Sequence, residues 1–241
     1  FLSDAKGEGW DGDPHAELEA LLAALSAGPV GIGDRVGCTD RELVLRTCRE
    51  DGVLVKPDVP LAALGRCMRR HPFLADAPIF ADTWSDHPAG RWRYVLALHA
   101  SRSDDELPFE LAPGEVGCDA ACIAYDWRSG NFARLEPEEA FTGRLAPGEW
   151  QLRVLCPLLP GGIAVFGDVF RYACAGDRRL EVRVTEDGVD VEVRGAAGES
   201  IDLRGWSASP LAGTASARDG RWRVRVEIPD RGWTRLQLRP V

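Results

Sequence analysis

The stretch Trp92-Arg-Tyr-Val-Leu-Ala-Leu-His99 alternates large apolar residues with polar or smaller ones at a period of two. This period places successive side chains on opposite faces of a β-strand. The same alternation recurs in Trp150–Cys156, Leu180–Val184, Val189–Val193 and Trp222–Ile228. We therefore predict antiparallel strands with one face in a core and the other face in water.

Turn-forming residues separate these stretches. They are Ser129-Gly130-Asn131, Pro147-Gly148, Glu186-Asp187-Gly188, Asp219-Gly220 and Asp230-Arg231-Gly232. Such residues adopt the backbone angles that tight turns require. About nine short strands at this spacing are typical of a sandwich. The sequence therefore predicts a mainly β protein, with an antiparallel β-sandwich over residues 72–241.

The first 56 residues follow a helical pattern instead. Asp13-Pro14 begins a predicted amphipathic helix that ends at Gly28. Pro29–Asp34 is a short apolar run bounded by glycines, which predicts a buried strand. Thr39-Asp40-Arg41-Glu42 then has the pattern of a capping box and predicts a second helix up to Asp51-Gly52. A helix, a buried strand and a helix in this order indicate an α/β unit.

One such unit cannot cover a parallel strand on both faces, so we expect the rest of the sheet to lie N-terminal to it. Phe1 is the first residue and Met68 the only methionine, which also predicts that a segment has been removed. We interpret residues 1–56 as the last α-β-α elements of a truncated (β/α)8 barrel. Residues 57–71 would then be a connector to the sandwich.

Charge and composition narrow the range of partners. The formal charge is −9, from 38 acidic and 29 basic residues. This net negative charge disfavours binding to nucleic acid or to an anionic membrane surface. No apolar run approaches the ~20 residues of a membrane helix. Seven cysteines in scattered, mostly apolar positions predict free thiols in the reducing cytoplasm.

Local motifs for catalysis are missing. The glycines of Gly28–Gly33 precede the turn where a phosphate loop would need them, and no Lys-Ser/Thr follows. The four histidines have no metal-ligand spacing, and no Gly-x-Ser-x-Gly elbow is present. We expect no cofactor and no metal. Trp92, Trp150 and Trp222 open strands, where core packing is expected more often than stacking on a sugar.

Several blocks together resemble one enzyme family. Ala27–Gly37, Arg41–Leu45 and Asp51–Pro57 resemble the "GGP…YVSD…ELLKKLVLPDG…LR" stretch of raffinose synthases and alkaline α-galactosidases, which are glycoside hydrolases of the family 36 type. Further blocks in the same order are Gly65–Cys67, similar to "TRDCLF", Tyr125–Leu135, similar to "YxxxTGDLYRL", and Pro160–Gly167, similar to "GIxFAPIGL".

The resemblance implies a barrel end followed by a C-terminal β-domain, which agrees with the division drawn from periodicity. It also implies a retaining mechanism with two aspartates, on motifs that this chain lacks, so no catalytic residue is carried over. The family's "DWDMF" motif would fall near Phe1–Glu8, where only Asp4 matches. Asp4 and Asp34 would follow barrel strands at the end where substrates bind, and we expect them to contact substrate hydroxyls unless they cap the next turn.

Two classes of function remain. The first is the C-terminal part of a carbohydrate-active enzyme that acts on α-galactosides, with its catalytic aspartates upstream; the parent protein could be a hydrolase, a galactosyltransferase or an inactive barrel. The alternative is a non-catalytic carbohydrate-binding or structural β-sandwich module. We favour the first, because the helix up to Ala27 and the run Val30–Ile32 both call for apolar neighbours.

Overall fold

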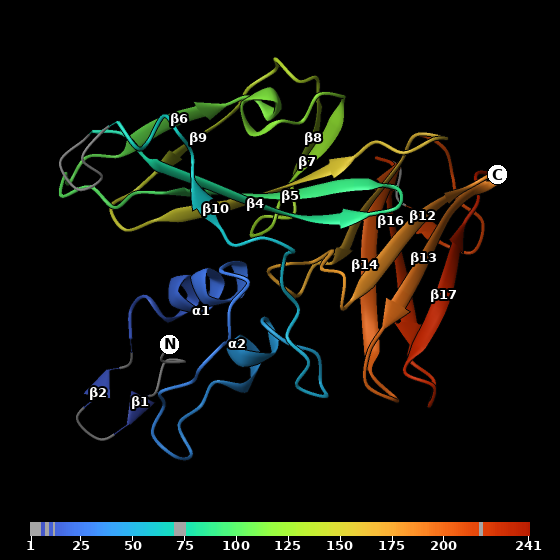
Figure 1. Ribbon diagram of the computed structural model, residues 1–241, viewed down its shortest axis with the longest axis horizontal. Coiled ribbons are helices and arrows are strands. Elements are labelled where there is room, and N and C mark those ends of the chain that lie inside the picture. Colours follow the sequence, from blue (N-terminus) through green and yellow to red (C-terminus); the bar gives the residue numbers. More distant parts are fainter. Residues whose placement is uncertain (1–5, 8–9, 12, 70–75, 217–218) are drawn as a thin grey trace.

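The computed structural model describes residues 6–7, 10–11, 13–69, 76–216 and 219–241. Over these residues the protein is mainly β, as predicted (Figure 1). The helices are α1 (Ala16–Leu25), α2 (Arg41–Leu45) and the 3-10 helix η1 (Pro113–Val116). The strands are β1 (Lys6–Gly7), β2 (Trp10–Asp11), β3 (Ala62–Ala63), β4 (Ile79–His87), β5 (Gly90–Leu98), β6 (Leu107–Leu111), β7 (Cys122–Asp126), β8 (Phe132–Leu135), β9 (Phe141–Leu145), β10 (Trp150–Pro157), β11 (Ile163–Asp168), β12 (Leu180–Thr185), β13 (Gly188–Arg194), β14 (Ser200–Ser207), β15 (Ala215–Ser216), β16 (Arg221–Glu227) and β17 (Trp233–Leu238).

The largest sheet has six antiparallel strands in the order β3-β4-β5-β10-β7-β8. One face of its central strand β5 buries Trp92, Tyr94 and Leu96 in the main core. The other face buries Val95 and Ala97 in a second core, under the two-stranded ribbon of β6 and β9. The prediction that this strand exposes one face to water is therefore wrong, because the ribbon covers that face.

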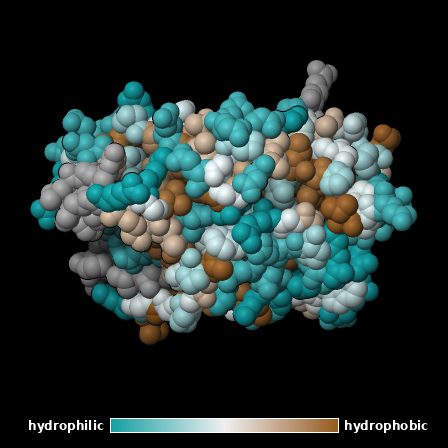
Figure 2. Space-filling view, turned by 45° about the horizontal axis from the view of Figure 1, so that its top comes forward, coloured by the Kyte–Doolittle hydropathy of each residue, from teal (hydrophilic) through white to brown (hydrophobic). Residues whose placement is uncertain are grey.

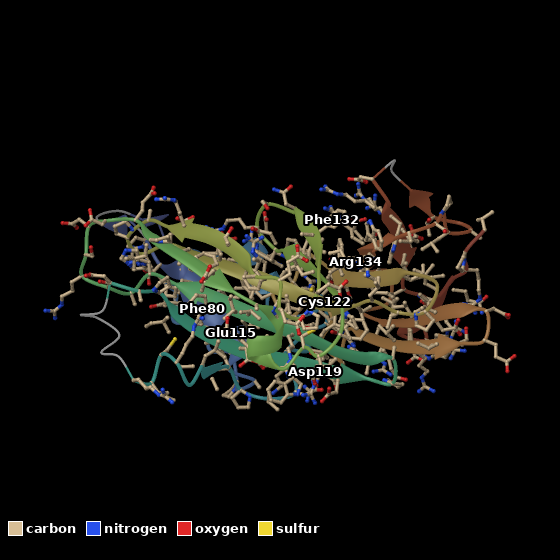
Figure 3. The ribbon with its side chains drawn as sticks, turned by 90° about the horizontal axis from the view of Figure 1, so that it is seen from above. Phe80, Glu115, Asp119, Cys122, Phe132 and Arg134 are labelled. Carbon is tan, nitrogen blue, oxygen red and sulfur yellow. The ribbon has the colours of Figure 1, made fainter. Side chains whose placement is uncertain are left out.

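The second core is built mainly from aromatic and aliphatic side chains. Phe80 packs edge-on against Phe109, with ring centroids 5.7 Å apart. Cys122 is fully buried beneath them in the same cluster. Figure 3 shows the molecule from above, and it labels Phe80 and Cys122 of this core together with Glu115 of η1 and Asp119. The ribbon and η1 together close the outer face of the six-stranded sheet.

The C-terminal strands form a small sandwich. A four-stranded sheet (β11-β14-β16-β15) lies opposite a three-stranded sheet (β12-β13-β17), and every neighbouring pair is antiparallel (Figure 1). Val191, Leu203 and Trp222 are buried between the two sheets. These strands alternate buried and exposed positions, as their sequences predict. Trp92, Trp150 and Trp222 are all core residues, at most 4% exposed.

The helices near the N-terminus form close to their predicted places. α1 buries Leu21 and Leu25 in the main core below the six-stranded sheet (Figure 1). The N-cap of α2 is Asp40 rather than Thr39, and its carboxylate accepts hydrogen bonds from the backbone N–H groups of Glu42 and Leu43, at 2.9 and 3.1 Å. α2 is shorter than predicted.

The segment 29–34 is not a strand, so the prediction of a buried strand fails here. Ile32 is 45% exposed and Val36 is 97% exposed. A parallel strand needs neighbours on both edges and cover on both faces. None of the described residues supplies a strand beside this segment, so it runs as an exposed loop between α1 and α2.

The surface is mostly polar. Figure 2 shows charged and polar side chains over most of one face, with apolar residues in small separate groups. No helix among the described residues is long and apolar enough to cross a bilayer. All seven cysteines have free thiols.

Candidate functional site

Of the two residues predicted to bind substrate, only Asp34 lies in the described part of the chain. Asp4 lies outside the described residues. Asp34 is half-buried in the loop after α1 and is not among the residues that line the cavity described below. Whether either carboxylate contacts a substrate remains a prediction.

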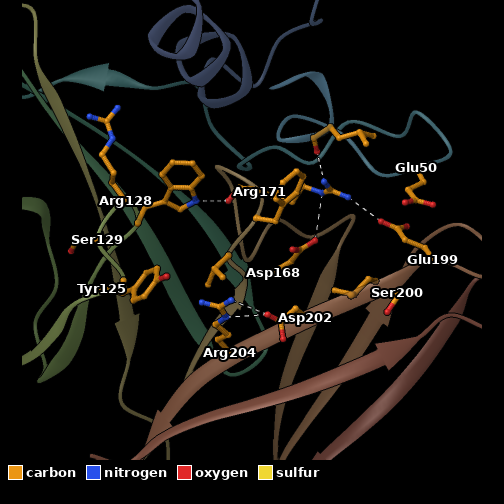
Figure 4. Close-up of a pocket in the computed structure, with 16 residues that line it drawn as sticks. Glu50, Tyr125, Arg128, Ser129, Asp168, Arg171, Glu199, Ser200, Asp202 and Arg204 are labelled. Carbon is orange, nitrogen blue, oxygen red and sulfur yellow. Dashed lines mark hydrogen bonds and ion pairs between the residues drawn. The ribbon is translucent and has the colours of Figure 1, made fainter. Parts of the chain in front are cut away.

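A cavity of about 570 Å³ lies where the six-stranded sheet, the loop after β11 and the edge of β14 meet (Figure 4). The segment that follows α2 closes one side. The lining residues are Leu45, Glu50, Tyr125, Trp127, Arg128, Ser129, Gly130, Asp168, Val169, Phe170, Arg171, Glu199, Ser200, Ile201, Asp202 and Arg204. Most of them are polar or aromatic.

Four buried charged residues form a cluster at this cavity, and three of them, Asp168, Arg171 and Glu199, line it. Arg179 lies 2.9 Å from Asp168 and 2.5 Å from Glu199, measured between nitrogen and oxygen atoms. Arg171 donates to Glu199 at 3.0 Å and also to the backbone oxygen of Leu45. All four side chains are at most 5% exposed. The cluster therefore joins β11, β14 and the end of α2 by paired charges.

The two carboxylates of this cluster have opposite pKa shifts. Burial is the largest influence on Asp168 and raises its pKa, although Arg179 and Arg171 act in the other direction. Burial also acts to raise the pKa of Glu199, but the hydrogen bond and charge of Arg179 outweigh it and lower that pKa. Glu199 is thus the carboxylate that the arginines hold ionised most strongly.

Aromatic side chains form the inner wall. The ring of Tyr125 stacks on Phe166, with centroids 4.5 Å apart and planes 25° apart. The indole N–H of Trp127 donates to the backbone oxygen of Arg171 at 2.8 Å. Phe170 is 38% exposed, and the Arg171 guanidinium lies 4.8 Å from its ring centroid. The inner wall thus combines the stacked ring of Tyr125 with the partly exposed ring of Phe170.

Ion pairs form the outer wall. Asp202 accepts from Arg204 at 2.9 and 3.1 Å and from Arg223 at 2.5 Å. Arg128 pairs with Glu17 of α1 at 2.7 Å. These side chains are part-exposed, so they keep free lone pairs and N–H groups at the opening.

Sequence reasoning missed this site. Its charged residues are ordinary surface types in the sequence, and they meet only because β11 and β14 are neighbours. One signal was present, since the blocks Arg41–Leu45, Tyr125–Leu135 and Pro160–Gly167 carry the family resemblance and reach this cavity or end beside it. The predicted substrate-binding residues are instead Asp4, which lies outside the described residues, and Asp34, in the loop after α1.

Comparison with known proteins gives a partial fold match. No family model and no curated protein matches the sequence. Similar solved structures include a candidate α-N-acetylgalactosaminidase from Bacillus halodurans, with 14% identity, a TM-score of 0.43, and coverage of 63% of this chain and 33% of that one. A family 27 β-L-arabinopyranosidase from Geobacillus stearothermophilus has 13% identity, a TM-score of 0.44, and coverage of 61% and 31%. A candidate α-galactosidase/melibiase from Bacteroides fragilis has 15% identity, a TM-score of 0.39, and coverage of 64% and 33%.

The chain thus spans about a third of the length of these solved structures. Family 27 shares a clan with family 36 but is a different family. At these identities and TM-scores the likeness assigns no activity to this chain.

Proposed function

We propose that this chain is the C-terminal part of a carbohydrate-active enzyme that acts on α-galactosides. In this proposal residues 1–56 belong to the end of a catalytic barrel and residues 72–241 are the β-domain behind it. Two aspartates of the barrel, outside the printed sequence, would perform a retaining reaction. The product would be a free sugar or a transferred galactosyl unit.

One observation carries the proposal. The loop 29–36 exposes Ile32 and Val36 to water, although its sequence resembles a buried barrel strand. The helices on either side of it are held in place by the β region, since Arg128, just after β7, pairs with Glu17 of α1 at 2.7 Å and Leu43 of α2 is buried in the main core. The loop is therefore presented on a fixed support, as a sheet that docked beside it would require.

The test is an assay of the product of the complete gene. With p-nitrophenyl α-D-galactopyranoside and raffinose, we expect release or transfer of galactose, with the α configuration of the first product retained when followed by NMR. Turnover of other glycosides but not of these two would contradict the choice of substrate. No turnover of any glycoside by a folded protein would contradict the enzyme assignment.

We also propose that the protein works in a reducing compartment such as the cytoplasm. The seven free thiols support this, and Cys156 and Cys174 have no exposed surface. Thiol titration of protein purified without reductant should find all cysteines reduced after denaturation. A stable disulfide in that preparation would contradict the proposal.

A further inference from the structure

We propose that the cavity between β7, the loop after β11 and β14 binds one neutral hexopyranose unit of a carbohydrate. Every residue that lines it belongs to this chain. Its volume of about 570 Å³ falls within the range of about 300–1,000 Å³ that is common for small-molecule sites. The choice of a galactoside as the first probe rests on the proposed function, whereas the chemistry of the walls specifies only a neutral sugar.

The hydroxyl of Tyr125 is the strongest indication of a ligand. The side chain is only 4% exposed, and Figure 4 shows its hydroxyl directed toward the middle of the cavity. No hydrogen bond joins that hydroxyl to a described residue, and burial of the side chain raises its pKa to about 12. The hydroxyl oxygen itself is not among the buried atoms without a partner, so it is accessible from the cavity and free to bond a ligand. The stacked ring of Phe166 holds it in one orientation, ready to donate to a ligand oxygen.

The charges of the lining favour a neutral ligand over an ion. Arg204 is paired with Asp202, and Arg171 is paired with Glu199. An anion would also meet the carboxylates of Glu50 and Asp202 at the opening, and a cation would meet the arginines. A polyol can use both the free lone pairs of such carboxylates and the free N–H groups of such guanidinium groups.

Phe170 supplies the apolar contact that a pyranose ring needs. The face of such a ring that carries C–H groups is apolar, while its hydroxyls point outward to polar partners. Phe170 lines the cavity and is 38% exposed. A sugar between this ring and the Tyr125 hydroxyl would combine apolar and polar recognition in the manner of other small-molecule sites.

The experiment is a calorimetric titration of the full 241-residue chain. The probes are methyl α-D-galactopyranoside, raffinose and methyl α-D-glucopyranoside, with sodium phosphate and sodium citrate as anionic probes. The variants are Tyr125→Phe, which removes only the hydroxyl, and Phe170→Ala. Trp233→Ala is the matched control, because Trp233 is 37% exposed but lies on β17, outside the cavity.

We expect one sugar to bind with a stoichiometry of one. Tyr125→Phe should weaken it about threefold to tenfold, as the loss of one hydrogen bond predicts. Phe170→Ala should weaken it by about tenfold, and Trp233→Ala should have no effect. Thermal melting confirms that each variant is folded.

Three results would overturn the proposal: no binding of any sugar, binding that neither cavity variant weakens, or binding of the anions in place of the sugars. The outcome is separate from that of the proposed function. An enzyme without this site would still turn over α-galactosides, and a sugar-binding chain from an inactive barrel would not.

Discussion

Arg179 has no exposed surface and contacts two buried carboxylates, Asp168 and Glu199. Arg179→Met would leave two negative charges facing the single charge of Arg171. Breaking a buried ion pair in this way costs about 3–5 kcal/mol. We therefore expect the free energy of unfolding in urea to fall by about this amount.

Two variants control this prediction. Arg183→Met removes an exposed partner of Glu181 and should cost less than about 1 kcal/mol. Adding Glu199→Gln to Arg179→Met removes one of the unpaired charges, so it should recover part of the loss. If Arg179→Met is no worse than Arg183→Met, the cluster does not hold the sheets together.

His87 makes the stability depend on pH. Its ring Nε2 lies 2.7 Å from the backbone oxygen of Ala175, and the ring packs edge-on against Trp92. Burial is the largest influence and lowers the pKa of His87 below its usual 6.5. The unfolded chain therefore binds more protons just below pH 6.5, so stability is present above this pH and is lost as the pH falls toward the folded pKa.

Urea unfolding at pH 7.5 and at pH 5.5 tests this dependence. The wild-type protein should be less stable at pH 5.5, and His87→Gln should show a smaller difference between the two pH values. His15→Gln, at an exposed histidine, is the control and should behave like the wild type. An equal pH dependence in His87→Gln would show that other groups are responsible.

The charged cluster could not be predicted from the sequence. Glu199 and Arg171 are 28 residues apart and belong to different segments. Nothing in their local pattern distinguishes them from surface residues, because their pairing is a property of which strands become neighbours. Asp34 is the opposite case, since a family pattern singled it out although it does not line this cavity.

At the level of elements, the small sandwich depends on close contact between strands. Gly205 of β14 pairs with Trp222 of β16 and with Val165 of β11. A Cβ at Gly205 would lie 2.2 Å from the backbone oxygen of Ala164 and 2.2 Å from the Trp222 ring. A backbone atom cannot rotate away, so a side chain here would force the strands apart.

We therefore expect Gly205→Ala to lower the free energy of unfolding by about 1–3 kcal/mol. Gly65→Ala is the matched control, because no atom lies within 4 Å of its Cβ position and its φ is not positive. It should leave stability nearly unchanged. Comparable losses in both variants would mean that the alanine itself, and not the contact between strands, causes the effect.

Elements were predictable where a local pattern decides them. β10, β13 and β16 alternate buried and exposed residues over most of their length, and the sequence placed them to within about one or two residues. β5 was placed as well, but its second buried face was not, because the ribbon of β6 and β9 that covers it is not encoded locally. The segment 29–34 failed because strand formation there depends on partners that the described residues do not include.

At the scale of the whole molecule, the helical segment and the β region form one unit. Arg128 donates to Glu17 of α1 at 2.7 Å, and the backbone N–H of Tyr172 donates to the backbone oxygen of Arg46 at 3.2 Å. α1 shares the main core with β5 and β10. Among the described residues of this segment, the exposed large apolar side chains are Ile32 and Val36, both in the loop 29–36. The proposed barrel would therefore pack against the loop 29–36, whose flanking helices the β region already holds in place.

Hydrogen exchange shows whether residues 29–36 form a barrel strand in the complete protein. It is measured in the 241-residue chain and in the product of the complete gene. In the 241-residue chain the amides of residues 29–36 should exchange quickly, since no described strand pairs with this segment. In the complete product they should be strongly protected as a paired barrel strand, while the amides of α1 exchange equally in both proteins. Equally fast exchange of residues 29–36 in both proteins would contradict the barrel and the enzyme proposed from it.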